Sequence, residues 1–499
     1  MRRDIPIGLP ILPERESPTQ FALLRAWLRQ CDKFHSCHKG QDASKIAMPT
    51  RVLYVGNPKD LDYASDFIRL VSVSEIAKQK YVALSHCWGD PSIEEKKVYC
   101  TTRDNIIQRS KGFSLSELPK TFQDAVKVTR ELDISYLWID SLCIIQDGDN
   151  GKDWELESGK METVFSHAHC VIAATAAVNS KAGFLKRDVS TEYVYVQDAS
   201  GKQFYISTDI DDFNNDVGNA LLNKRAWVMQ EGVLSRRTIH FSANQTYWEC
   251  GEGIYCENLT RLRSPVTNRY FILDPNFPDR LIRSGMRRTL DCIAFLFQDY
   301  SMRTLTVPTD RYVAISGLVV RMEGALNCHS RYGIFQKYFH RNLLWQASNN
   351  KMKEIAYDYY VPSWSWMACS GGIQFMDITL GEVEWNDHLL FDEKCECDHA
   401  IIADLWTFQN CTTRLYETQC TVLDYSGVER GRMQYDVEGG QDLRKEQCVL
   451  VGRRSNRGIQ EFYILIVKST GVDGEYRRIG VGSIQSDYVV KQRIDIRLV

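Results

Sequence analysis

Strand and helix patterns alternate along the chain from Tyr81 to about Cys250. Strand patterns occur in YVALS (81–85), SYLWID (135–140), HCVIAATA (169–176) and RTIHFS (237–242), and the apolar run of HCVIAATA is continuous, as is typical of a strand covered on both faces. Helical spacing of apolar residues is found between them, in LPKTFQDAVKVTREL (118–132), DWELESGKMETVFSHA (153–168) and LLNKRAWVMQEGVL (221–234). The stretch from Gly183 to Asn219 has no pattern, and we expect it to be irregular. Repeated β–α units predict a parallel sheet with helices on both faces, which binds ligands at the C-terminal ends of its strands.

Different patterns flank this α/β region. An amphipathic helix is predicted from Phe21 to about Cys37, and RVLYVG (51–56) and FIRLV (67–71) predict a hairpin. Helical patterns dominate residues 281–346, and strand-like runs follow Pro362. We therefore predict an N-terminal helical segment (1–50), an α/β domain (51–260), a helical region (261–360) and a β-rich C-terminal region (361–499).

Composition and charge describe an ordinary globular protein. The chain has 499 residues, of which 44% are hydrophobic and 25% are charged, and its net charge is −3. This balance gives no electrostatic indication of nucleic-acid binding. No apolar run approaches the roughly 20 residues that span a bilayer, and no secretory signal is readable. We therefore expect a soluble cytoplasmic protein with no membrane span and no nucleic-acid partner.

Sixteen cysteines are scattered at irregular spacings, which favours buried reduced thiols over a disulfide framework. Two clusters have metal-binding residue types: Cys31, His35, Cys37 and His38, and Cys395, Cys397 and His399. Neither has the paired C-x-x-C spacing of a structural zinc site. We expect these residues to pack or to lie in loops, without a metal.

The motifs of P-loop, dinucleotide-fold, zincin and hydrolase-elbow enzymes are absent. Polar and aromatic residues instead follow the predicted strands in three sets. The first set is Ser85, His86, Trp88 and Gly89; the second is Asp140, Cys143 and Gln146; the third is Arg225, Trp227 and Glu231. Trp227 and Glu231 are four residues apart, so they share a helix face. A carboxylate beside an aromatic ring is able to stabilise an oxocarbenium-like transition state on a sugar.

Each set also has a structural explanation. The tryptophans fit a core, Asp140 fits a turn cap, and Cys143 fits a small buried hydrophobe. Glu231 could form an ion pair with Arg225, Arg236 or Arg237. Glu157 is a rival carboxylate, because its spacing from Trp154 and Met161 turns it inward, and an inward glutamate needs a partner or a function.

Four segments, in this order, resemble the fungal heterokaryon-incompatibility (HET) domain: YVALSHCWG, LPKTFQDAVKVTRELDISYLWIDSLCIIQD, DWELESGKMETVFSHA and RAWVMQEGVLSRRTIHF. The resemblance runs over roughly Leu53 to Cys256. Further along the chain, DRYVAISGL, NLLW and VPSWSWMA resemble segments of whole HET proteins more weakly. The resemblance implies a role in non-self recognition and regulated cell death.

HET domains are also similar to TIR domains, several of which cleave NAD⁺ at the nicotinamide–ribose bond. This similarity implies a parallel-sheet, TIR-like (flavodoxin-like) fold. It places Glu231 at the position of the TIR catalytic glutamate and Trp227 at that of the preceding tryptophan. Ser85, His86, Trp88 and Asp140 would then line the nucleotide pocket. The loops at Asp90–Ser116 and before Leu221 are longer than a minimal TIR domain needs.

These resemblances lead to one main hypothesis, an effector that hydrolyses NAD⁺ or a related nucleotide. NAD⁺ would be a substrate, and no other cofactor is expected. Because TIR enzymes usually work when assembled, we also expect self-association or an incompatibility partner protein. The alternatives are a non-catalytic signalling module that acts through protein–protein contacts, and an enzyme of small-molecule metabolism on the same scaffold.

Overall fold

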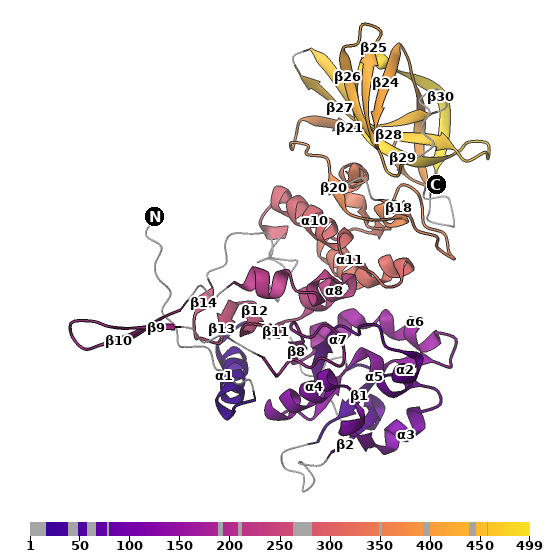
Figure 1. Ribbon diagram of the computed structural model, residues 1–499. Helices are drawn as coiled ribbons and strands as arrows, with labels where there is room; N and C mark the ends of the chain where they lie inside the picture. Colours follow the sequence, from indigo (N-terminus) through magenta and orange to yellow (C-terminus); the bar gives the residue numbers. More distant parts are fainter. Residues whose placement is uncertain are drawn as a thin grey trace. The chain divides into compact units, whose positions relative to one another are not determined.

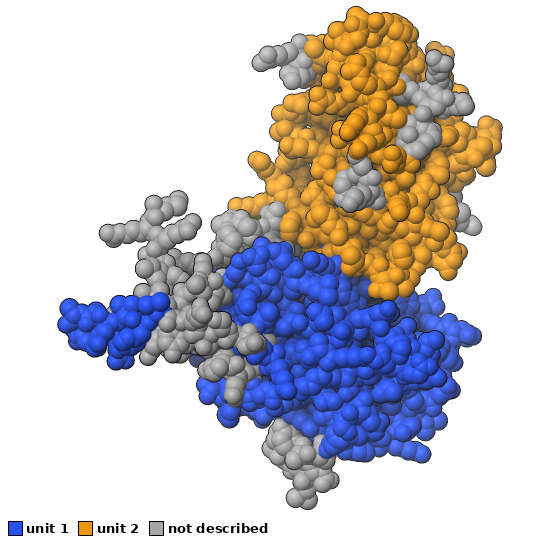
Figure 2. Space-filling view, in the orientation of Figure 1, with its two compact units in different colours: residues 1–280, 313–318 blue, residues 281–312, 319–499 orange. Residues whose placement is uncertain are grey.

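The structure is a computed structural model that describes residues 16–37, 48–56, 66–76, 79–187, 193–207, 212–262, 282–348, 352–392, 400–438, 446–456 and 458–499. The chain divides into two compact units, which Figure 2 shows in different colours. The first comprises residues 1–280 and 313–318, and the second comprises residues 281–312 and 319–499. No helix among the described residues is long and apolar enough to cross a bilayer.

A ten-stranded mixed sheet is the centre of the first unit. Its strands, in spatial order, are β14 (Arg261–Leu262), β13 (Gly253–Cys256), β12 (Thr246–Cys250), β11 (Arg237–Phe241), β8 (Cys170–Ala173), β3 (Val82–Ser85), β6 (Tyr136–Trp138), β1 (Arg51–Tyr54), β2 (Phe67–Ser72) and β5 (Phe113–Ser114). The four strands β11, β8, β3 and β6 are mutually parallel. Every other neighbouring pair is antiparallel.

The prediction of a parallel sheet is therefore right for the four strands on which it was based, but the whole sheet is mixed, with antiparallel strands on both flanks. Only four residues separate β11 from β12. A parallel return needs a crossover of a dozen or more residues, so this connection has to form an antiparallel hairpin. On the other side, the predicted β1–β2 hairpin is confirmed, and β1 joins it to β6.

Helices cover the parallel strands (Figure 1), and strands covered in this way are largely buried. Every residue of β3 and β8 is buried. The main helices are α1 (Pro18–Phe34), α4 (Lys120–Glu131), α6 (Lys152–Ser158), α7 (Met161–His167) and α8 (Ala226–Leu234). The helical spacing of apolar residues in this segment puts Phe122, Ala125, Val126 and Thr129 on one face of α4, and all four are buried. Helix α1 packs against α4 and β12, and α7 packs against α8.

Two local predictions are wrong. The single helix expected over residues 153–168 is two helices, α6 and α7, which are separated by Gly159 and Lys160. Glycine is a poor helix former, and here it follows α6 directly. The segment expected to be irregular contains a hairpin of β9 (Tyr193–Gln197) and β10 (Gln203–Ser207), which extends from the body of its unit (Figure 1). Short elements complete the unit: α2 (Ile93–Tyr99), β4 (Thr101–Thr102), α3 (Ile106–Lys111), α5 (Asp140–Cys143) and β7 (Ile145–Asp147).

The second unit begins with helices and ends in strands, as the sequence predicts. Its helices are α10 (Met286–Ser301), α11 (Val313–Leu326), whose residues to Leu318 belong to the first unit, and α12 (Phe339–Leu343). Short strands follow or interrupt them: β15 (Ser330–Arg331), β16 (Ile334–Phe335), β17 (Trp345–Ala347), β18 (Lys353–Glu354), β19 (Cys369–Ser370) and β20 (Ile373–Phe375).

A second large sheet contains β21 (Val383–Trp385), β22 (Leu390–Phe391), β23 (Ile401–Phe408), β24 (Cys411–Tyr416), β25 (Gln419–Asp424), β26 (Glu429–Tyr435), β27 (Gln447–Asn456), β28 (Ile459–Ser469), β29 (Glu475–Gln485) and β30 (Val489–Leu498). The pairings β23–β27–β28–β29–β30–β23 close a ring of strands. Closure of this kind removes the exposed edges of an open sheet.

Candidate functional site

The candidate site lies at the C-terminal edge of the parallel strands. Ser85 is the last residue of β3, and Asp140 begins α5 directly after β6. Because β3 and β6 are parallel neighbours, their C-terminal ends meet at one edge of the sheet. Glu231 reaches the same place from α8, a helix with nearly every residue buried.

Asp140 joins the first two predicted sets. Its Oδ2 accepts a hydrogen bond of 2.8 Å from Nε1 of Trp88. Its Oδ1 lies 3.9 Å from Nδ1 of His86 and accepts a hydrogen bond from the backbone N–H of Ser141. The His86 ring is parallel to that of Trp88, at 6.5 Å between centroids, and meets the edge of Phe122 at 5.0 Å. The imidazole is therefore held on three sides.

Arg225 connects the third set to the first. It precedes α8 as its N-cap, and its guanidinium donates a hydrogen bond to the backbone carbonyl of His86. Glu231 forms no ion pair among the described residues, because each candidate arginine is engaged elsewhere. Arg236 donates to the carbonyl of Cys37, and Arg237 pairs with Asp32 at 2.6 Å.

Three polar atoms at this edge are buried without a well-formed hydrogen bond: Ser85 Oγ, His86 Nε2 and Glu231 Oε2. The side chain of Ser141 adds a fourth, its Oγ. A buried polar atom without a partner costs about 1–3 kcal/mol, so native proteins contain few of them. Four such atoms on neighbouring segments are typical of a site whose partner is a ligand.

Burial shifts the protonation of the two central groups in opposite directions. It raises the pKa of Glu231 to about 7, although the nearby Ser85 hydroxyl and Arg225 act to lower it. It lowers the pKa of His86 to about 4, so the imidazole is neutral at pH 7 and its approach to Asp140 is not an ion pair. The site therefore offers a carboxyl that exchanges its proton near neutral pH beside a neutral imidazole.

Two members of the cluster are accessible to solvent. Ser85, His86 and Glu231 are buried, whereas Trp88 and Asp140 are partly exposed. A ligand from solution therefore meets the Trp88 ring and the Asp140 carboxylate first. Positive charge on such a ligand would be attracted by both, through the ring face and through the carboxylate.

The other predicted residues of the first two sets support this edge. Gly89 has φ of +74°, and a Cβ there would lie 2.5 Å from Cβ of Asn179, so the turn after Trp88 requires glycine. The amide of Gln146 donates to the carbonyl of Asp140 at 3.2 Å. Cys143 is buried, and burial raises the pKa of its thiol to about 12, which suits a packing residue.

Glu157 and Trp227 lie in other surroundings. Glu157 is buried, but its Oε1 accepts hydrogen bonds from Thr50 at 2.7 Å and from Lys160 at 2.8 Å. These partners account for its burial. The Trp227 ring packs edge-to-face against Trp154 of α6, at 6.3 Å between centroids.

Two residues of the site were not predicted. Phe122 appeared only as part of the buried face of α4, and Ser141 was passed over although it follows Asp140 directly. Ser141 could have been predicted from its position, because it directly follows a carboxylate at the end of a strand. Nothing in the sequence indicates that the Phe122 ring meets His86.

The structure describes most of the first cysteine–histidine cluster and none of the second. Cys395, Cys397, His399 and His38 lie outside the described residues. Cys31, His35 and Cys37 do come together, and the distant Cys250 joins them. This group lies at the C-terminal ends of α1 and β12, whereas Glu231 lies on α8.

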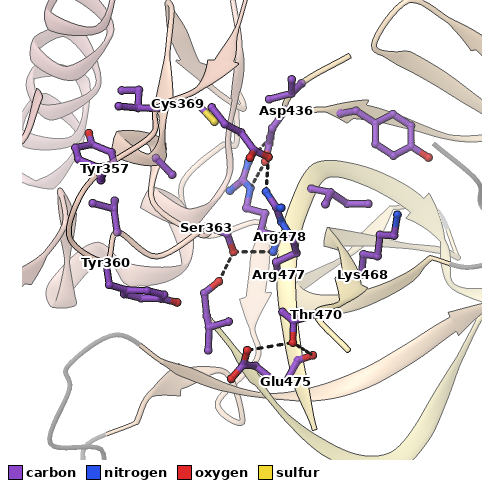
Figure 3. Close-up of a pocket in the computed structure, with 18 of the residues that line it drawn as sticks. Tyr357, Tyr360, Ser363, Cys369, Asp436, Lys468, Thr470, Glu475, Arg477 and Arg478 are labelled. Carbon is purple, nitrogen blue, oxygen red and sulfur yellow. Dashed lines mark hydrogen bonds and ion pairs between the residues drawn. The ribbon is translucent and has the colours of Figure 1, made fainter. Parts of the chain in front are cut away.

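The second unit contains a pocket of about 500 Å³ between its short strands and its large sheet (Figure 3). The arginines in its wall are paired with carboxylates: Arg478 with Asp436 and Arg477 with Glu354. The Arg478 guanidinium also lies over the Trp345 ring and donates to the carbonyls of Leu343 and Trp345. These contacts stabilise the unit, and the pocket contains none of the predicted site residues.

The comparisons with known proteins agree with the sequence resemblance. A family model described as Heterokaryon incompatibility protein (HET) matches residues 81–231. The matched segment starts at the strand that ends in Ser85 and finishes at Glu231, so it contains both sides of the site. No curated protein and no solved structure matches the chain. Residues 81–231 of the chain therefore contain a heterokaryon incompatibility (HET) domain.

Proposed function

We propose that the HET domain binds NAD⁺ or a related nucleotide at the edge formed by Ser85, His86, Trp88 and Asp140, and hydrolyses its nicotinamide–ribose bond. In the cell this activity would make the protein an effector of non-self recognition and regulated cell death. The observation that carries the proposal is the set of buried polar atoms without a well-formed hydrogen bond, around a carboxyl whose pKa burial raises to about 7.

The order of the parallel strands supports a TIR-like reading. Numbered along the chain, β3, β6, β8 and β11 are arranged spatially as 2-1-3-4. This is the order of flavodoxin-like folds, which bind nucleotides at the carboxyl ends of their strands near the first strand. Ser85 and His86 follow that first strand, and the helix before β11 carries the Trp-x-x-x-Glu pair.

The reaction suits a carboxylate whose negative charge is not neutralised by an ion pair. The bond from nicotinamide nitrogen to ribose C1′ breaks with its electron pair leaving on nicotinamide, and positive charge develops on the ribose ring. Ionised Glu231 stabilises that charge across a buried site, where electrostatic attraction is strong. Water then adds at C1′ and loses a proton, which gives ADP-ribose, nicotinamide and H⁺. The cationic nicotinamide ring of the substrate also favours the ionised form of the carboxyl.

The test is nicotinamide release from NAD⁺ by the purified full chain, followed by chromatography at several protein concentrations. Wild type is expected to turn over, more strongly where it self-associates. Glu231→Gln should lower kcat by at least about 100-fold, the scale of a lost catalytic group. Glu157→Gln is the matched control, because it removes a buried carboxylate of a different cluster.

Two results would contradict the proposal. Turnover retained in Glu231→Gln would remove the assigned carboxylate, and loss in Glu157→Gln alone would move the assignment there. Cell killing by the expressed wild type with unchanged NAD⁺ levels, and no turnover in vitro, would favour a signalling module that acts through protein contacts.

A further inference from the structure

Four side chains with metal-binding atoms converge where helix α1 meets strand β12. They are Cys31, His35, Cys37 and Cys250, and all four are buried. No two of their ligand atoms are more than 4.8 Å apart, and Cys250 Sγ lies 3.4 Å from Nδ1 of His35. Among the described residues, no other group of three or more His, Cys, Asp or Glu side chains is this close.

Local structure brings three of the ligands together. Cys31 and His35 are four residues apart at the C-terminal end of α1, so their side chains share one face. The chain leaves the helix at His35 in an extended conformation, and this turn returns the Cys37 side chain to the same face. The fourth ligand, Cys250, is the last residue of β12 and follows His35 by 215 residues.

Contacts along α1 fix its register against β12. The Gln20 amide donates to the Thr246 hydroxyl at 3.0 Å, and the Trp27 ring packs on Trp248 at 6.4 Å. These contacts continue toward the C-terminal ends of both elements, where the cysteines meet. The convergence is therefore part of the docking of the helix.

The donor set fits zinc. A tetrahedral Zn²⁺ site has Zn–S distances of about 2.3 Å and Zn–N distances of about 2.0 Å, which puts its donor atoms roughly 3.5–3.8 Å apart. The observed donor atoms lie within 4.8 Å of one another, with one pair at 3.4 Å, so side-chain rotations of about 1 Å would bring them to this spacing. Three sulfurs and one imidazole nitrogen form a Cys₃His set, which is a common structural zinc arrangement. Soft thiolate ligands exclude Mg²⁺ and Ca²⁺.

The surroundings compensate the charge of such a site. Three thiolates and Zn²⁺ carry a net charge of −1. Arg237 of the neighbouring strand β11 lies close enough to Cys31 to interact with its charge, and a backbone N–H from Gly251 points to Cys37. The His35 ring stacks on Tyr255 at 6.1 Å, which orients the imidazole.

We propose that Cys31, His35, Cys37 and Cys250 bind one Zn²⁺ ion that fastens helix α1 to the large sheet of the first unit. This unit contains the HET domain and is called the HET unit below. The ion links segments more than two hundred residues apart, so it restrains the unfolded chain strongly. The site is distinct from the Glu231 cluster and does not depend on the proposed NAD⁺ hydrolysis.

The test is the metal content of the full chain, purified under reducing conditions and measured by inductively coupled plasma mass spectrometry. We expect about one zinc ion per chain in wild type and less than about a tenth of that in Cys250→Ser. Cys170→Ser is the matched control, because Cys170 is equally buried in β8, also lies near Arg237 and belongs to no cluster. It should keep the full zinc content.

A second measurement covers the case in which Cys250→Ser does not fold. Wild type is stripped with a chelator and reconstituted with Co²⁺, which should give the intense visible bands of tetrahedral cobalt and a thiolate charge-transfer band. X-ray absorption of the zinc form should show three sulfur neighbours and one nitrogen. Zinc-free wild type that also takes up no Co²⁺ would overturn the proposal. So would iron in place of zinc, or a disulfide between two of the cluster cysteines.

Discussion

Glu231 is expected to destabilise the folded protein at neutral and alkaline pH, and Glu231→Gln should relieve this. Burial raises the pKa of Glu231 from 4.5 to about 7. A carboxyl with a raised pKa in the folded state makes the protein less stable as pH rises. Below pH 4.5 the group is protonated in both states and has no effect. Between 4.5 and 7 the unfolded chain loses the proton first, and above 7 the full penalty is present.

The magnitude follows from the two pKa values. The difference between 4.5 and about 7 corresponds to roughly 3 kcal/mol, at about 1.36 kcal/mol for each pKa unit. Glutamine has the shape of the protonated carboxyl and does not ionise. Glu231→Gln should therefore match wild type near pH 4.5 and exceed it by up to about 3 kcal/mol at pH 8. For a unit of this size that is a rise in Tm of roughly 6–12 °C.

The assay is differential scanning calorimetry of both proteins from pH 4.5 to 8.5. Glu157→Gln is the control, because its carboxylate has two hydrogen-bond partners in the folded state. That variant should lose stability at pH 8. A Glu231→Gln protein that is less stable than wild type at pH 8 would refute the raised pKa and the absence of a partner.

Three further substitutions test other parts of the structure. Gly89→Ala should destabilise the HET unit by about 1–3 kcal/mol in urea unfolding, because φ is +74° and the new Cβ meets Asn179. Trp88→Phe loses a 2.8 Å hydrogen bond to the carboxylate that follows β6, which should lower stability by about 1.5–3 kcal/mol in urea unfolding and weaken nucleotide binding in calorimetry. Arg478→Ala leaves the buried Asp436 carboxylate without its partner, and should destabilise the C-terminal unit by about 3–5 kcal/mol in urea unfolding.

Each of these has a result that would contradict it. Unchanged stability in Gly89→Ala would show that the turn tolerates a side chain, and unchanged binding in Trp88→Phe would place the nucleotide elsewhere. For the buried arginine, Arg453→Ala is the control, since Arg453 pairs with Glu384 at the surface. An exposed pair contributes at most about 1 kcal/mol. Equal effects at the two arginines would contradict the role of burial.

The sequence predicts the centre of the HET fold because local pattern and tertiary environment agree there. The apolar runs ending at Ser85 and Ala173 are strands covered on both faces, and the face of α4 around Phe122 is buried as its spacing requires. The flanking antiparallel strands were missed as part of the same sheet, because pairing partners are set by connection length and not by pattern. The helix break at Gly159 was missed because the apolar spacing continues across it.

The candidate site was predicted as a set of residues and not as a set of interactions. That Asp140 follows a strand is readable from the chain, but its hydrogen bond with Trp88 depends on which strands are neighbours. Likewise, the sequence left open an ion pair between Glu231 and Arg225. The structure turns the Arg225 guanidinium to the carbonyl of His86, so the carboxyl keeps a raised pKa. Cys250 is the extreme case, since no spacing rule connects it to His35.

The buried residues Glu157 and Glu231 separate function from folding. Glu157 is explained by folding alone, because Thr50 and Lys160 hydrogen-bond its carboxylate. Glu231 is not, because at pH 8 its ionised form raises the free energy of the folded state and its Oε2 lacks a well-formed hydrogen bond. Under the proposed function, this cost of folding is retained because the carboxylate acts on the ligand. The two glutamine variants should therefore change stability in opposite directions, and nicotinamide release should be lost only in the variant that becomes more stable.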